Sequence, residues 1–315
     1  AKNEKIPLLV IVGSTASGKT ELAARLAREF SGEVISADSM QIYKGMPVAT
    51  AAPTEAETLG VPHHLIGFAA PGAAFSVADY VRLAHEKIRE VHGRGRLPVL
   101  AGGTGLYVSS VLSNVAFPAQ RSDAALRESL REQAEREGAG SLLERLAKFD
   151  PETAARLHPN DLGRIIRAIE IYELTGVPMT RHLLESKKTP PPYESRIIGI
   201  TFRDRQKLYA RIDARVSRML ENGLLDEARR ALEAPGKTAA QALGHKEFAK
   251  YLRGGQDLHE AVETLKRETR RYAKRQLTWF SKLPGVYWIE RDAAEDVYAA
   301  AKGIVLESGI LSNIK

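Results

Sequence analysis

Hydrophobic and polar positions recur along the chain with two periods, which together predict a sheet wrapped by helices. Short, mostly apolar runs at 8–12, 33–37, 97–101 and 196–201 predict strands. Residues 21–28, 75–92, 106–115 and 206–222 instead carry a helical pattern of apolar positions. Strands that alternate with helices are typical of a parallel sheet covered by helices, so we predict an α/β fold.

Two stretches interrupt this alternation. Residues 44–74 are rich in glycine, proline and alanine and predict a long loop that carries His63 and His64. We expect these histidines to hold the loop by hydrogen bonds, because no third metal ligand is spaced near them. Residues 118–192 are charged, helical and free of a convincing strand. They predict a helical insertion domain within a core of residues 1–117 and 193–315.

A long helix predicted at 258–282 is strongly basic. Arg270, Arg271 and Lys274 lie on it among the aromatic residues Tyr272 and Trp279. Basic residues interleaved with aromatic rings suit a polynucleotide backbone and unstacked bases. A solvated helix face with its aromatic rings in the core explains the same pattern equally well.

Composition narrows the chemistry. The 315 residues include no cysteine, which excludes disulfides, thiol nucleophiles and cysteine-bound zinc. A net charge of +7 favours a polyanionic partner or a phosphate-bearing ligand. The apolar run 6–12 is far too short to span a membrane and the first residues lack a signal-peptide pattern, so we expect a cytoplasmic protein without membrane contact.

The strand at 8–12 leads into a phosphate loop of the pattern G-x-x-x-x-G-K-T, followed by a helix. In such loops, successive backbone N–H groups point at one anion, the lysine reaches the outer phosphates and the threonine hydroxyl can bind Mg²⁺. We therefore predict that a diphosphate or triphosphate binds here. The predicted diphosphate-binding residues are Gly13, Ser14, Thr15, Ala16, Ser17, Gly18, Lys19 and Thr20, with Thr20 as the Mg²⁺ ligand.

Two further strands end in polar loops, at Asp38 and at Thr104. Because ligands bind beyond the carboxyl ends of parallel strands, these loops and the phosphate loop are expected to meet at one cleft. From the residues alone, Asp38 is either a general base or a water-mediated Mg²⁺ ligand. The strand before Thr104 ends in glycine where an NTP hydrolase usually has its metal-binding aspartate, which weighs against an ATP-driven motor.

Six motifs, taken together, resemble the tRNA dimethylallyltransferase (tRNA isopentenyltransferase) family of bacterial type. They are G-x-T-A-S-G-K-T at 13–20, I-S-A-D-S-x-Q-x-Y-x-G-M at 35–46, P-H-H-L at 62–65, A-G-G-T-G-L-Y at 101–107, H-P-N-D at 158–161 and A-K-R-Q-x-T-W-F at 273–280. The resemblance implies a P-loop NTPase-like core. It also implies transfer of a dimethylallyl group from dimethylallyl diphosphate to N6 of the adenosine immediately 3′ of the anticodon, in tRNAs that read codons beginning with U.

The resemblance also implies roles for individual residues. Asp38 is the general base, Lys19 offsets the charge of the diphosphate, and Thr104 and Arg215 steady the leaving group. The expected partner is the anticodon stem-loop of tRNA, which the insertion grips, and the enzyme is expected to act as a monomer. The expected tRNA-binding residues are Asp38, Ser39, Met40, Gln41, Thr104, Arg127, Gly163, Arg164, Ile165, Ile166, Arg167, Gln241, Ala242, Leu243, Gly244, His245, Lys246, Arg270, Arg271 and Lys274.

Three other functions stay open. An adenylate isopentenyltransferase uses the same loop and base on a free nucleotide, but it does not need the insertion or the basic helix. In a small-molecule kinase, Lys19 and Thr20 would hold ATP and Asp38 would activate a hydroxyl group. An RNA-binding module with a vestigial phosphate loop would have no reason to keep Lys19, Asp38 and Thr104 intact.

Overall fold

The computed structural model describes residues 5–115, 122–186, 188–233 and 242–314. It divides into two compact units, one of Ala1–Leu112 with Pro192–Lys315 and one of Ser113–Pro191. We call the first the core unit and the second the inserted unit. Their bounds lie close to the predicted ones.

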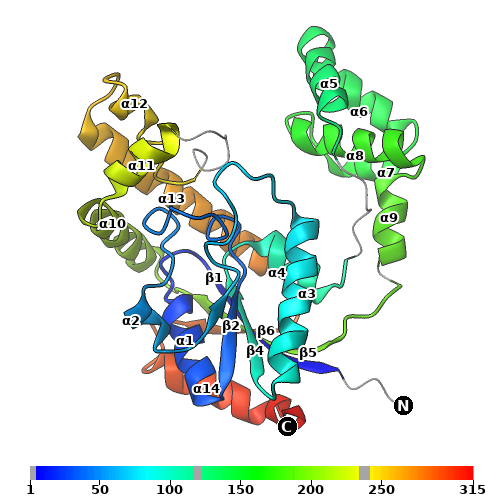
Figure 1. Cartoon of the computed structure of the whole chain (residues 1–315). Helices are drawn as coiled ribbons and strands as arrows, with labels where there is room; N and C mark the ends of the chain where they lie inside the picture. The colour runs from blue at the N-terminus through cyan, green and yellow to red at the C-terminus, as the bar shows by residue number, and fades with distance from the viewer. Residues whose placement is uncertain (1–4, 116–121, 187, 234–241, 315) are drawn as a thin grey trace. The chain divides into compact units, whose positions relative to one another are not determined.

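A six-stranded sheet forms the centre of the core unit (Figure 1), in the order β3-β2-β4-β1-β5-β6. Every neighbouring pair of strands is parallel. This arrangement confirms the predicted α/β fold with a parallel sheet. The strands are β1 (Ile6–Gly13), β2 (Gly32–Ser36), β3 (His63–His64), β4 (Leu97–Gly102), β5 (Tyr193–Thr201) and β6 (Val286–Glu290).

Helices cover both faces of this sheet. On one face, α1 (Lys19–Glu29) and α14 (Val297–Glu307) bury Leu26 and Val305 against Ile11 of β1. The other face carries α3 (Val77–Gly93), α4 (Gly105–Leu112) and α13 (Leu258–Phe280). Helix α3 begins with the predicted capping box, in which Ser76 and Asp79 bond to each other's backbone N–H groups.

A helical lobe of the core unit packs against the segment that follows β2. It consists of α10 (Arg205–Glu221), α11 (Leu224–Glu233), α12 (Ala249–Leu252) and part of α13. Ile42, Tyr43 and Met46 are buried against it. The predicted loop at 44–74 is therefore not loop throughout. Part of it packs into the core, and it contains α2 (Glu55–Thr58) and β3.

Hydrogen bonds of His63 and His64 fix this segment, as predicted. His64 Nε2 lies 2.6 Å from Glu33 Oε2 on β2, and His63 Nδ1 lies 2.9 Å from the Val61 carbonyl oxygen. Within the described ranges, no three histidine, aspartate or glutamate side chains gather into a metal site.

The inserted unit is helical, as predicted. Its helices are α5 (Ala124–Glu137), α6 (Ala139–Ala147), α7 (Pro151–Arg156), α8 (Leu162–Thr175) and α9 (Met179–Ser186). Their apolar faces form a core of their own, in which Leu142, Leu146, Ile165 and Ile169 are fully buried. The unit therefore has the hydrophobic core of a small domain.

The sequence analysis missed two elements at the C-terminal end of the core unit. Strand β6 extends the sheet beside β5, and α14 packs onto α1. No helix in the described parts of the chain has the length and apolar character needed to cross a membrane.

Candidate active site

The phosphate loop leaves β1 at Gly13 and enters α1 at Gly18. Gly18 has φ 91°, in the left-handed region that glycine adopts without strain. Gly13 leaves no room for a side chain, since a Cβ would lie 2.8 Å from Ser17 Oγ and 2.9 Å from the Ile200 carbonyl oxygen. The backbone at Ala16 accepts a hydrogen bond of 2.8 Å from Arg211 Nε. These contacts hold the loop folded over the N-terminus of α1.

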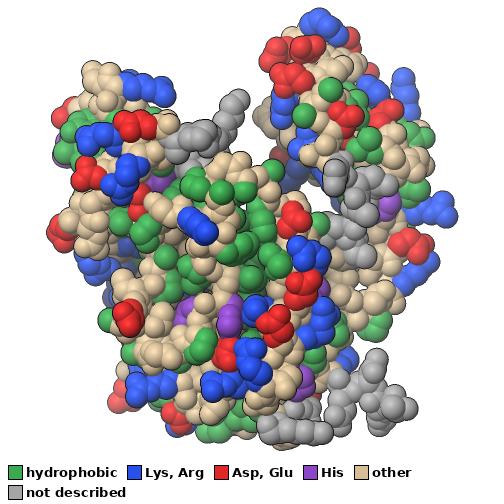
Figure 2. All heavy atoms as spheres, in the orientation of Figure 1, with side chains coloured by type: hydrophobic (Ala, Val, Ile, Leu, Met, Phe, Trp, Pro, Cys, Tyr) green, Lys and Arg blue, Asp and Glu red, His purple; other side chains and the backbone are tan. Residues whose placement is uncertain are grey.

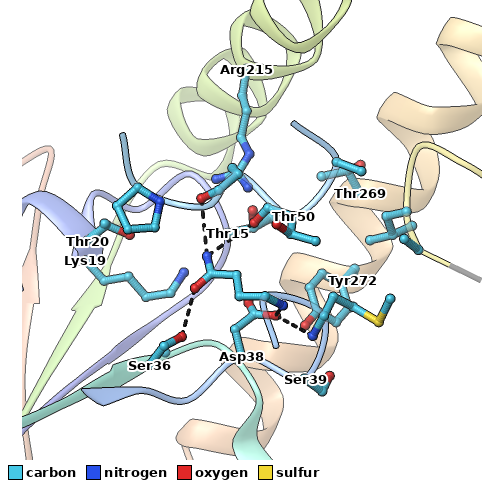
Figure 3. Close-up of a pocket in the computed structure, with 18 of the residues that line it drawn as sticks. Thr15, Lys19, Thr20, Ser36, Asp38, Ser39, Thr50, Arg215, Thr269 and Tyr272 are labelled. Atoms are coloured by element: carbon cyan, nitrogen blue, oxygen red, sulfur yellow. Dashed lines mark hydrogen bonds between the residues drawn. The ribbon is translucent and has the colours of Figure 1, made fainter. Parts of the chain in front are cut away.

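Lys19 and Arg215 bring positive charge to the inner side of this loop (Figure 3). Lys19 Nζ donates to the Ser14 carbonyl oxygen at 3.3 Å. Burial and the neighbouring Arg215 guanidinium lower the pKa of Lys19 to about 8, while the Asp38 carboxylate acts in the opposite direction. Burial likewise lowers the pKa of Arg215. Two cations in the wall of one cavity favour a ligand with more than one negative charge.

Asp38 follows β2 and lies at the same edge of the sheet. Its Oδ1 accepts hydrogen bonds from the backbone N–H of Met40 at 2.9 Å and of Gln41 at 3.4 Å. The Ser39 N–H donates to Thr104 Oγ1 at 2.9 Å, and the Thr104 N–H donates to the Ala37 carbonyl oxygen at 3.0 Å. The carboxyl ends of β2 and β4 are therefore tied together, as the strand pattern predicted.

A cavity of about 300 Å³ brings these residues together. One part of its wall is polar and includes Lys19, Thr20, Asp38, Arg215 and Tyr272. Burial, and secondly the Asp38 charge, keep the pKa of Tyr272 well above its usual range, so its hydroxyl group stays protonated. Another part of the wall is apolar and includes Ala49, Val216, Met219, Leu243 and Leu265. Such a cavity can hold a charged group at one end and a short hydrocarbon at the other.

Hydrophobic side chains also reach the surface near this cavity. Figure 2 shows them gathered on the face of the core unit between the sheet and the lobe of α11 and α12. Phe68, on the segment that precedes α3, is 38% exposed.

Two polar side chains, one half-buried and one buried, hold the cavity wall in place, a role that the sequence analysis did not assign to them. Gln41 Oε1 accepts from Ser36 Oγ at 2.8 Å, and Gln41 Nε2 donates to the carbonyl oxygens of Thr50 and Ala51. Glu227 of α11 accepts hydrogen bonds from the Val48 and Ala49 N–H groups, each at 2.8 Å. No local pattern could indicate the Glu227 contacts, because the partners lie 178 and 179 residues away.

The tRNA-binding residues predicted in the core unit fall into several groups. Ser39, Met40, Gln41, Leu243 and Lys246 line the cavity, while Arg271 and Lys274 lie on the exposed side of α13. Gly244, with φ 101°, is buried in a turn against Leu224. Gln241 lies outside the described residues.

Two of these predictions need correction. The side chain of His245 is 0% exposed and is not available to a nucleic acid, whereas Ala242, at 2% exposed, lines the cavity. His245 Nε2 instead lies 3.0 Å from Glu227 Oε1. Arg270 donates to Asp213 of α10 at 2.7 Å and lies over the Tyr209 ring, which makes it a link between α13 and α10.

In the inserted unit, the predicted contacts cluster near the start of α8. Gly163 and Arg164 are exposed. Ile165 and Ile166 are 0% and 4% exposed and belong to the core of the unit, so their side chains are corrected from tRNA contacts to packing residues. Arg127 and Arg167 are partly exposed, and both bind the fully buried carboxylate of Glu170.

The fold and the cavity define a class of protein: a P-loop NTPase-like core with a carboxylate and an apolar wall beside its phosphate loop. Two family models match the chain, "IPP transferase" over residues 41–283 and "Isopentenyl transferase" over residues 6–66. The chain belongs to the tRNA dimethylallyltransferase family and is a prenyl transferase, as the sequence motifs predicted.

Individual relatives agree with this assignment. The chain is 49% identical to a tRNA dimethylallyltransferase of Acetivibrio thermocellus, over 90% of this chain and 92% of the relative. It is 46% identical to that of Bacillus subtilis, over 96% of each chain.

Solved structures are similar as well. A full-length tRNA isopentenylpyrophosphate transferase from Bacillus halodurans is 43% identical, with a TM-score of 0.70 over 98% of this chain and 99% of that one. A eukaryotic dimethylallyltransferase acting on tRNA is 29% identical, with a TM-score of 0.82 over 98% of this chain and 80% of that one. These similarities confirm the P-loop NTPase-like fold.

Proposed function

We propose that the protein transfers the dimethylallyl group of dimethylallyl diphosphate to N6 of the adenosine immediately 3′ of the anticodon. The product is N6-isopentenyladenosine, in tRNAs that read codons beginning with U. One observation carries this proposal: Lys19, Arg215 and Asp38 meet in a cavity whose wall also has an apolar part, and Thr104 is hydrogen-bonded to the N–H of Ser39, the residue after Asp38. Val216, Met219 and Leu265 offer apolar contacts that suit a five-carbon chain better than the polar acceptor of a kinase.

The reaction follows from the placement of these groups. The diphosphate lies in the phosphate loop, and the five-carbon chain extends along the apolar wall. Nitrogen N6 attacks the terminal carbon, the carbon–oxygen bond to diphosphate breaks, and the N6 proton passes to the Asp38 carboxylate. Lys19 and Arg215 stabilise the charge that builds on the leaving diphosphate, and the Thr104 hydroxyl group donates to it.

Magnesium fits the same site. The Thr20 hydroxyl group and the Asp38 carboxylate line the cavity, and Ser17 Oγ is buried without a hydrogen-bond partner among the described residues. Mg²⁺ prefers oxygen ligands and is usually held by one or two side chains together with phosphate oxygens and water. Thr20 would hold the ion, which would offset the charge of the diphosphate.

The acceptor is the anticodon stem-loop. Its adenine must leave the base stack to reach Asp38, which requires an enzyme that holds the loop open. Exposed arginines of the inserted unit and the basic side of α13 are the surfaces that we assign to this grip. The proposed enzyme is a monomer that works in the cytoplasm, where its tRNA substrates are found.

The test uses the purified protein with Mg²⁺, dimethylallyl diphosphate and an unmodified tRNA carrying three adenosines 3′ of its anticodon. We expect mass analysis of the digested nucleosides to show one added isopentenyl group on one adenosine. A tRNA with guanosine at the target position is the matched control and gains nothing. Transfer to AMP run in parallel, or phosphate transfer from ATP to a small alcohol, would contradict the proposal.

A further inference from the structure

Gln276 of α13 joins two loops of the site that are far apart in sequence. Its Oε1 accepts a hydrogen bond of 2.8 Å from the Thr15 N–H of the phosphate loop. Its Nε2 donates a hydrogen bond of 2.9 Å to the Gly103 carbonyl oxygen. The side chain is 5% exposed. Because one partner is a backbone donor and the other a backbone acceptor, the carboxamide has a single satisfied orientation.

The second loop leads directly to the reacting groups. Gly103 precedes Thr104, whose hydroxyl group accepts the N–H of Ser39, the residue after Asp38. A Cβ at position 103 would overlap Gln276 Nε2, so the approach of α13 requires glycine there. One turn further along α13, the Trp279 ring occupies the space that a Cβ at Gly105 would need. Helix α13 thus contacts this loop at two successive turns.

We infer that Gln276 is a positioning residue for the prenyl transfer. It fixes the distance between the phosphate loop, which holds the diphosphate, and the Thr104–Asp38 segment, which acts on the leaving group and on N6. Gln276 lines the same cavity, but its carboxamide group is occupied by these two backbone partners. Its loss therefore slows the chemical step more than it weakens tRNA binding, because a displacement of about 1 Å in reacting groups costs about 100-fold in rate. This inference rests on the proposed function.

Two substitutions of the same size separate the two hydrogen bonds. Gln276→Met fills the space and makes neither. Gln276→Glu keeps an acceptor for the Thr15 N–H, but its carboxylate repels the Gly103 carbonyl oxygen. When protonated, the same glutamic acid donates to that oxygen and restores both bonds. The ratio of the Gln276→Glu rate to the wild-type rate should therefore rise as pH falls, and the Gln276→Met ratio should stay constant.

The experiment measures single-turnover rates with saturating donor and tRNA between pH 5.5 and 8.5. Over these roughly three pH units, the general base is expected to stay ionised and able to accept a proton. Thermal unfolding and tRNA affinity are measured on the same samples. We expect Gln276→Met to lose about 100-fold in rate while its tRNA affinity is unchanged. Gln206→Glu, on the exposed first turn of α10, is the matched control and keeps the wild-type rate.

The result that overturns the inference is a wild-type rate for Gln276→Met, or a Gln276→Glu ratio that does not change with pH. Both outcomes are read against wild-type protein that transfers the prenyl group. A wild-type protein without transfer activity contradicts the proposed function instead. In that case, affinity for inorganic diphosphate, measured by calorimetry, still tests the positioning role: the folded Gln276→Met variant must bind diphosphate more weakly than the wild type.

Discussion

The two units of the chain use their buried polar side chains differently. In the core unit, Gln41, Glu227 and Gln276 bond to backbone groups of loops that line the cavity. In the inserted unit, Glu170 and Asp150 bond to side chains and helix starts of the unit itself. In the core unit, these side chains therefore fix the loops of the cavity. In the inserted unit, they fix the ends of helices and the side chains of arginines.

This contrast leads to different expectations for substitutions. Changes among the polar side chains of the core unit that hold the cavity loops should lower the reaction rate with little effect on tRNA affinity. Changes among the arginines of the inserted unit, or in the carboxylates that hold them, should lower stability or affinity and leave the chemical step intact. Four predictions follow this division, beginning with the largest effect.

Removal of the general base should have the largest effect. Asp38→Asn keeps an Oδ1 acceptor for the Met40 N–H, so the turn after β2 is preserved. The amide cannot take the N6 proton, and we expect kcat to fall by about 1,000-fold. Single-turnover prenyl transfer measures the change, and filter binding should show unchanged tRNA affinity.

Asp226→Asn, at an exposed position of α11, is the control for this experiment and should leave kcat unchanged. Wild-type turnover by Asp38→Asn would show that another group accepts the proton. The expectation that this residue of the core unit determines the rate of the chemical step would then be wrong.

The second prediction concerns the pH dependence of donor binding. Lys19 has its pKa lowered to about 8, so the free enzyme loses this charge as the pH rises through that value. We expect kcat/KM for dimethylallyl diphosphate to be constant below that value and to fall above it, since this parameter reports the free enzyme. Lys19→Met should lose about 10- to 100-fold in kcat/KM, the value of one charge-assisted hydrogen bond.

Lys207→Met is the matched control, since this lysine lies on the exposed side of α10 near Asp292. The pH dependence near 8 should be absent in Lys19→Met and present in the control. A decline that persists in Lys19→Met would assign it to another group.

The elements that these predictions rely on were largely visible in the sequence. The phosphate loop, Asp38 and Thr104 each follow a buried strand, and the carboxyl ends of parallel strands meet at one edge. Local pattern and general topology were therefore sufficient to bring them together. Strand β6 was missed although Val286, Tyr287, Trp288 and Ile289 form a β-branched and aromatic run after Gly285, which is a usable signal.

The supporting contacts could not be found in this way. Gln276 and Thr15 are 261 residues apart. The helical pattern of α13 places Gln276 on the buried face with Ala273 and Phe280, but it does not identify the partners of its carboxamide group. The same limit explains the errors at His245, Ile165 and Ile166. A motif shows that a residue belongs to a site, but only the packing shows whether its side chain faces the ligand or the core.

The third prediction tests the inserted unit. Glu170 has no exposed side-chain surface, and its carboxylate accepts from Arg127 at 2.8 Å and from Arg167 at 2.6 Å. Burial alone would raise the pKa of Glu170, but these arginines hold it below its usual range. Glu170→Gln removes the negative charge that both arginines bind, so it should lower the free energy of unfolding by about 2 kcal/mol. The loss is not larger because the two partly exposed arginines can be hydrated instead.

Chemical denaturation measures this change, and Glu173→Gln in the exposed pair with Arg145 is the control, with an effect below about 0.5 kcal/mol. Because the pKa of Glu170 is depressed in the folded state, its contribution is present at neutral pH and is lost as the pH falls through the acidic range. The stability difference between wild type and Glu170→Gln should shrink accordingly. An equal difference at neutral and acidic pH would contradict the ionic role.

The fourth prediction concerns the basic side of α13, where we expect the smallest effect, a change in tRNA affinity and in its salt dependence. Arg271 and Lys274 are exposed, whereas Arg270 is held by Asp213. If the exposed pair contacts phosphates, Arg271→Ala with Lys274→Ala should lower tRNA affinity at low salt and reduce the slope of log K against log salt by about 1.5. The same charge is removed in the control, Arg82→Ala with Lys87→Ala on α3, where the slope should not change.

Arg270→Ala gives the contrasting result within the same helix. It leaves Asp213 without its partner and removes the cation over the Tyr209 ring, so it should lower thermal stability without changing the salt slope. A slope that responds to Arg270→Ala but not to the exposed pair would reverse the assignment. The side of α13 that faces α10 would then be the one that meets tRNA, and the half-exposed ion pair between Arg270 and Asp213 would have to open when tRNA binds.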